Sequence, residues 1–231
     1  MARPTKQAAT AAAVILAGLI SAAGPALSET PMDAAKRFAQ TLSAGEQSAL
    51  QPFQSADRAA VRLTPGRRSG LPLRDMDTDT RAAAFGLLQT LLSPRGMALV
   101  EAVRVRESRL AEIEGDANYR DKDGYTMALF GQPGPGDWGV RFEGHHLSIN
   151  LAMKGGQPVS VLPFLIGANP PQGPQGDILL PFIRGAADPR VFRADLASAF
   201  QPGAPVPAPG GMEIDLVDSG LGHPHLSVAP R

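Results

Sequence analysis

The sequence contains no cysteine, no excess of charge of one sign and, after its first 28 residues, no long hydrophobic run. The lack of cysteine excludes disulfides and thiolate chemistry, so stability must come from packing. Any metal would then be held by His, Asp, Glu or Asn. Lys plus Arg and Asp plus Glu both number 22, and this balance argues against a protein that binds nucleic acids, which would show a basic face. Hydrophobic residues make up 43% of the chain, as in an ordinary globular protein with a core.

The first 28 residues have the pattern of a secretory signal peptide. Arg3 and Lys6 precede an apolar centre at 11–20, which is shorter than the about 20 apolar residues of a membrane span. The small-residue pattern Ala26-Leu27-Ser28 suits cleavage before Glu29. We therefore expect export to the periplasm or the extracellular space, and no membrane association after cleavage. The alternative is an uncleaved N-terminal anchor.

Residues 29–200 are predicted to form a single α+β domain, with N-terminal helices packed on a C-terminal antiparallel β-meander. Apolar spacing and capping residues predict helices near residues 31–42, 46–51, 80–92 and 94–114. Alternating patterns predict strands at 125–130, 138–143, 145–153 and 159–166. The segment 62–75 is rich in Gly, Pro and Arg and predicts an irregular loop. Residues 201–231 begin with a Pro- and Gly-rich stretch that predicts a tail.

The alternation of apolar and polar residues changes phase at Gly144. Trp138, Val140 and Phe142 share one face before it, whereas Leu147 would fall on the opposite face if the strand continued. A β-bulge at Gly144 would restore a single apolar face. A tight turn at Gly144-His145 would do the same by pairing the two halves as a hairpin.

Either solution gathers polar residues on the other face of the sheet: Arg141, Glu143, His146, Ser148 and Asn150. A carboxylate, an imidazole and an amide suit general acid/base work or metal binding, with Glu143 and Arg141 as catalytic candidates and Asn150 as a substrate contact. The alternative is a solvated surface, since an antiparallel sheet commonly has one polar face. His145 and His146 are candidate metal ligands, although adjacent strand residues point to opposite faces.

Two other groups are weaker candidates for substrate binding. The guanidinium groups of Arg67 and Arg68 could hold an anionic substrate group, although arginines in loops are usually solvated. Asn169 precedes Pro170 and could equally be a turn residue.

Three segments carry a resemblance to a known family: 69–76, 138–150 and 167–170. Together they resemble the uncharacterised family catalogued as domain of unknown function 3500, over roughly residues 34 to 200. The resemblance implies an exported bacterial or fungal protein and carries no established activity.

Longer members of that family end with a His-x-His element, and His223-Pro-His225 is similar to it. Two histidine pairs could then close around one divalent metal ion (zinc, copper or manganese), with Glu143 or Asn150 as a further ligand. The alternatives are a flexible tail with two incidental histidines, or a truncated copy that has lost activity.

Two functional hypotheses follow. The sequence has no Gly-x-Ser-x-Gly elbow, P-loop, His-Glu-x-x-His helix or dinucleotide fingerprint, which excludes the common hydrolase, nucleotide-binding and zincin classes. The first hypothesis is a metal-dependent hydrolase or lyase. The second is a non-catalytic exported protein that binds a small ligand or a partner.

Overall fold

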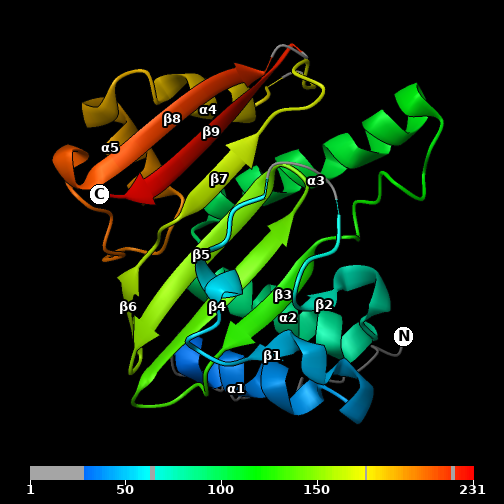
Figure 1. The fold of residues 1–231 in the computed structure, drawn as a ribbon, viewed down its shortest axis with the longest axis vertical. Coiled ribbons are helices and arrows are strands. Elements are labelled where there is room, and N and C mark those ends of the chain that lie inside the picture. The colour runs from blue at the N-terminus through cyan, green and yellow to red at the C-terminus, as the bar shows by residue number, and fades with distance from the viewer. Residues whose placement is uncertain (1–28, 63–65, 175, 220–221) are drawn as a thin grey trace, which may run out of the picture.

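A twisted sheet carries helices on one face and an irregular loop on the other (Figure 1). This computed structural model describes residues 29–62, 66–174, 176–219 and 222–231, of which 218 and 219 are described by their backbone alone. The expected signal peptide, residues 1–28, lies outside the described residues. The predicted α+β class is confirmed.

The helices fall into two groups along the chain. The α-helices are α1 (Pro31–Thr41), α2 (Thr78–Leu91), α3 (Pro94–Glu114), α4 (Leu179–Gly185) and α5 (Pro189–Ser198). Short 3-10 helices are η1 (Ala44–Ala49), η2 (Ala56–Ala59), η3 (Leu73–Asp75) and η4 (Pro209–Gly211). The first three α-helices match the expected positions, whereas α4 and α5 were not expected. No helix in the described part of the chain is long and apolar enough to cross a bilayer.

The strands form one sheet in the order β1-β3-β4-β5-β7-β9-β8, with β2 beside β3 and β6 beside β5. They are β1 (Leu50–Gln51), β2 (Leu71–Pro72), β3 (Thr126–Phe130), β4 (Asp137–Gly144), β5 (Leu147–Lys154), β6 (Gln157–Ser160), β7 (Phe164–Gly167), β8 (Met212–Ser219) and β9 (His223–Pro230). All pairs are antiparallel except β1 with β3. The predicted strand 159–166 is divided between β6 and β7.

The helix starts follow local capping chemistry. The side chain of Thr30 accepts a hydrogen bond from the Asp33 amide, and Asp77 and Ser93 cap α2 and α3 in the same way. Each such cap satisfies one of the amide groups that a helix start leaves without a partner. Gly115 ends α3 with a φ of 73°. These local interactions explain why the first helices could be placed from sequence.

The phase change at Gly144 is resolved by a hairpin. Gly144 pairs directly with Leu147, so His145 and His146 form a two-residue turn between β4 and β5. The β-bulge alternative is therefore wrong, and the turn begins one residue later than the hairpin alternative placed it. Trp138, Phe142 and other apolar residues of this hairpin pack into the core shared with the helices.

The expectation of a tail over 201–231 is wrong for its second half. β8 and β9 form a hairpin, and β9 pairs with β7 so that Gly167 lies opposite His225. Leu226 and Val228 are buried in the main core. The Pro- and Gly-rich segment 202–211 is only the connection that leads into this hairpin. The residues after it alternate in polarity and form strands.

Candidate functional site

The turn between β4 and β5 presents two adjacent histidines at one end of the sheet. His146 has a φ of 58°, a left-handed conformation that is uncommon for residues other than glycine. The hydroxyl of Tyr125 donates a hydrogen bond to the carbonyl of His145 at 2.6 Å. Gly144 must lack a side chain, because a Cβ there would lie 2.4 Å from the Tyr125 ring. The turn is thus held in an unusual conformation by its surroundings, as at many functional sites.

Three histidines meet at this end of the sheet. His146 comes from the turn, and His223 and His225 come from the start of β9, which lies two strands away from β5. One ring nitrogen from each of the three residues lies within 4.8 Å of the other two, and the residues are 3 to 7% exposed. Imidazole nitrogens at this mutual spacing could hold a metal ion.

Burial favours the neutral, metal-binding form of His146. Its pKa is lowered far below the usual range, first by burial and then by the neighbouring His145, His225 and His223. A neutral imidazole keeps a lone pair for a metal, whereas an imidazolium does not. The His146 imidazole is therefore neutral and can bind a metal ion without first releasing a proton.

His145 lies beside this cluster and has other partners. Its ring packs on that of His146 with centroids 3.6 Å apart, and its Nδ1 lies 2.5 Å from Oε1 of Glu107 on α3. The Arg120 guanidinium contacts the same ring at 3.2 and 3.3 Å from its two nitrogens. His145, a predicted ligand, therefore lies outside the three-histidine group and is held by a carboxylate and a guanidinium.

The polar face of the hairpin is buried. Arg141 and Glu143 are 1% and 0% exposed, and Arg141 Nη2 lies 3.0 Å from Glu143 Oε2. Arg68 Nε reaches the other carboxylate oxygen at 3.2 Å. Burial raises the pKa of Glu143, while Arg141 and Arg68 oppose this shift. The alternative of a solvated surface is therefore wrong, because η2 and the segment 66–70 cover this face.

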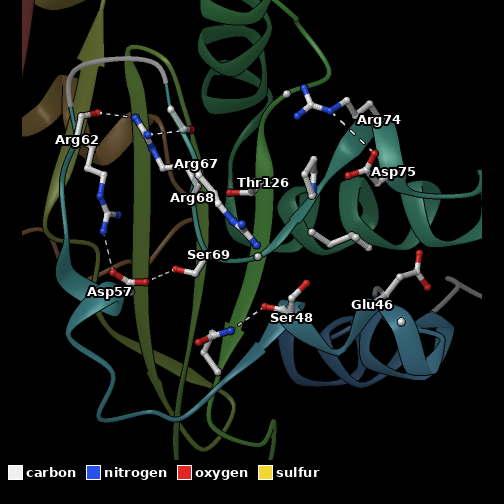
Figure 2. A pocket seen from close by; sticks show the side chains of 17 residues that line it. Glu46, Ser48, Asp57, Arg62, Arg67, Arg68, Ser69, Arg74, Asp75 and Thr126 are labelled. Atoms are coloured by element: carbon white, nitrogen blue, oxygen red, sulfur yellow. Dashed lines mark hydrogen bonds and ion pairs between the residues drawn. The ribbon is translucent and has the colours of Figure 1, made fainter. Parts of the chain in front are cut away.

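The covering loop is fixed to the sheet through Arg141. This guanidinium donates hydrogen bonds to the Asp57 carbonyl and, at 3.1 Å, to the Ser69 hydroxyl. Ser69 donates to the Asp57 carboxylate at 2.5 Å, and Arg62 donates to the same carboxylate at 2.8 Å (Figure 2). Arg141 and Glu143 thus form part of a buried network with a structural role.

The remaining predicted substrate contacts are separated from one another. Asn150 is buried and donates to the Ser148 hydroxyl at 3.0 Å and the Pro163 carbonyl at 2.7 Å. Asn169 is half-buried and precedes Pro170 through a cis peptide bond. Arg67 is exposed in a cleft, whereas its neighbour Arg68 is buried against Glu143. Both arginines line this cleft, and Arg67 is the exposed one of the two.

Several residues of the site were not identified from sequence. Glu107 and Arg120 contact His145, Tyr125 fixes the turn, and Asp57 with Ser69 anchors the loop. Glu107 lies within a long helix among other charged residues, where nothing in the local pattern separates it from a surface glutamate. Of this group, only Ser69 fell inside a segment that carried the family resemblance.

Together, these features define an α+β protein without cysteine whose buried group of three histidines could hold a metal ion. The family model described as "Protein of unknown function (DUF3500)" matches residues 26–182, and the chain belongs to that family. The match includes Arg141, Glu143, His145 and His146 and ends before His223. No curated protein and no solved structure matches the chain.

Proposed function

We propose that this protein is an exported metal-dependent enzyme, a hydrolase or lyase, whose metal ligands are His146, His223 and His225. The observation that carries the proposal is the mutual approach of their ring nitrogens to within 4.8 Å in a buried position. The three residues come from two segments that are distant in the sequence. A metal ion bound by all three rings would connect the β4–β5 turn to the start of β9.

The ligand set indicates which metals to test. Imidazole nitrogen suits zinc and copper, whereas manganese prefers oxygen ligands. Zinc bound by three histidines keeps a fourth position for water or substrate and lowers the pKa of bound water to about 7. We therefore rank zinc and copper above manganese for this site.

His145 is the side chain best placed to act beside the metal. It packs on His146, and it lines a cleft that the three ligands do not line. Glu107 fixes one of its ring nitrogens, as carboxylates do for histidines that must keep one orientation. We assign to His145 contact with the bound substrate and to Glu107 the positioning of that ring.

The alternative function is a non-catalytic exported protein that binds a small ligand. It is favoured by the buried ion pairs of Arg141 and Glu143, which withdraw these two residues from a catalytic role. An inactive member of the family would share this arrangement. Metal analysis separates the metal-dependent enzyme from the ligand-binding protein.

The test is elemental analysis of protein purified without chelator or affinity tag, after incubation with zinc, copper or manganese and removal of excess metal. About one ion per chain is expected, and it should be lost in His223→Ala and His225→Ala. For the third ligand, His146→Gly is the better variant, because glycine tolerates the positive φ at this position.

His145→Ala is the matched control, since it removes a neighbouring imidazole that is outside the ligand group. Circular dichroism of each variant checks the fold. Loss of metal in the ligand variants with retention in the control supports the proposal. A parent protein that holds no metal after all three incubations overturns it.

A further inference from the structure

Two clefts meet beside the loop that covers the sheet. The larger cleft, about 970 Å³, is lined by η1 and the segment 66–72, and Figure 2 shows its side chains. The smaller cleft, about 210 Å³, is lined by Glu107, Tyr125 and His145. Gly66, Arg74 and Gly124 line both clefts, so the two clefts adjoin at these residues and the smaller one reaches His145. The two adjoining clefts are called the groove below.

Three of the arginines that line this groove are offset by acidic partners. Arg62 lies 2.8 Å from Asp57, and Arg74 lies 2.9 Å from Asp121. Arg68 lies 3.2 Å from the buried Glu143. The acidic partners therefore partly neutralise these three guanidinium groups, and the ion pairs connect the segments around the groove.

Arg67 differs from these three arginines. It is exposed, it lines the larger cleft, and no ion pair joins it to an acid within the described ranges 29–62, 66–174, 176–219 and 222–231. Figure 2 places it between the Arg62–Asp57 pair and the Arg74–Asp75 pair. Its positive charge is therefore available to a ligand in the groove.

The acidic residues that line the groove each have a partner within the protein. Asp75 and Asp121 lie 3.9 and 2.9 Å from Arg74. Glu46 accepts hydrogen bonds from the amide and hydroxyl of Ser43 at 2.8 and 2.6 Å, and Glu107 holds His145. Asp57 accepts from Ser69 and Arg62. These carboxylates are paired within the protein, whereas the Arg67 guanidinium is exposed in the cleft and can meet an anion.

From this arrangement we infer that the groove binds a small organic molecule with a carboxylate or phosphate group, held by Arg67. The rest of the molecule extends past Arg74 toward His145. A guanidinium suits both kinds of oxyanion because its N–H groups can donate two parallel hydrogen bonds. This inference rests on the proposed function for the reacting end, since His145 packs on the proposed ligand His146. The binding end depends on Arg67 alone.

Calorimetric titration at low ionic strength tests the binding end, with citrate as the carboxylate probe and inorganic phosphate as the phosphate probe. Arg67→Ala should weaken binding of the preferred probe by about tenfold or more, as expected for loss of a charge-assisted hydrogen bond. Arg67→Lys should retain part of the affinity, because lysine keeps the charge without the planar fork. Arg190→Ala, at an exposed position on α5, is the matched control.

Binding of citrate alone or of phosphate alone, weakened by Arg67→Ala and unchanged by Arg190→Ala, supports the inference and identifies the oxyanion. Binding of neither probe, or equal affinity in Arg67→Ala and the parent, overturns it.

The metal content of Arg67→Ala is measured in parallel and should equal that of the parent. A protein that binds metal but neither probe would refute the groove and leave the metal centre intact. A protein that binds a probe through Arg67 but holds no metal would refute the enzyme and leave the groove intact.

Discussion

The ring centroids of His146 and His225 lie 4.6 Å apart. His146 belongs to the β4–β5 turn, whereas His225 belongs to β9, which is separated from β5 by β7. β7 lies between β5 and β9 and ends at Gly167, directly opposite His225. The Gly167 amide donates to the His146 carbonyl at 2.8 Å. The end of β7 thus brings the turn and the last strand together.

Gly167→Ala should weaken metal binding without removing any ligand. A Cβ at this position would lie 2.9 Å from Cδ2 of His225 and 3.1 Å from Cγ of His146, so at least one ring must move. Displacing metal ligands in this way should lower zinc affinity by about 10-fold or more. Competition with a chromophoric chelator measures the change. Gly136→Ala is the control, because a Cβ there meets nothing within 4 Å, and equal zinc affinity in the two variants would contradict the prediction.

Arg141→Ala should destabilise the fold strongly. It leaves Glu143 buried with less compensation and removes the contacts that fix the loop to the sheet. Breaking a buried ion pair by removing one partner typically costs about 3–5 kcal/mol in the free energy of unfolding. Urea denaturation measures this cost.

Arg109→Ala provides the comparison, since it removes the exposed pair with Glu112 and should cost less than about 1 kcal/mol. Similar losses in the two variants would mean that the buried network contributes no more than a surface pair.

Asp57→Asn should reduce stability in a pH-dependent way. The hydrogen bond from Ser69 and then that from Arg62 lower the pKa of Asp57 below its unfolded value of about 3.9. The carboxylate therefore contributes stability above this unfolded value, and the contribution is lost as pH falls through the folded pKa. The parent should exceed Asp57→Asn in free energy of unfolding at neutral pH, and the two should converge in acid.

Ser69→Ala should reduce the pH dependence of stability that Asp57 causes, because it removes the hydrogen bond that lowers the Asp57 pKa most. Urea titrations at several acidic pH values check both variants. A gap between the parent and Asp57→Asn that stays constant with pH would contradict the assignment.

If the protein is exported as we propose, its mature form should begin at Glu29. In the structure, the Glu29 carboxylate accepts hydrogen bonds from the Arg37 guanidinium at 2.6 and 2.8 Å, which ties this residue to α1. Intact-mass analysis of protein recovered from outside the cytoplasm measures the N-terminus. A mass that includes residues 1–28 would favour the uncleaved anchor.

The parts of the fold that depend on local sequence were predictable. Thr30, Asp77 and Ser93 cap their helices through bonds to amides three residues away. The phase change at Gly144 left two possible backbone conformations there, a β-bulge or a hairpin turn, and the second is the one that the structure has. The last hairpin, β8–β9, was missed because the Pro- and Gly-rich segment before it resembles a tail.

The site was less predictable, because its contacts join distant segments. Arg141 and Glu143 have the same alternating pattern whether water or a loop covers them. The family resemblance drew attention to both histidine pairs, but the pattern could not show that His145 turns to Glu107 while His146 joins His223 and His225. That separation follows from the two-residue turn and the positive φ of His146.

The most direct test of the metal centre is a crystal structure of the zinc-incubated protein, with diffraction data collected on both sides of the zinc absorption edge. The account predicts an anomalous peak between His146, His223 and His225, with three Zn–N distances of about 2.0–2.1 Å. No peak at this position, or a peak held by other residues, would contradict it.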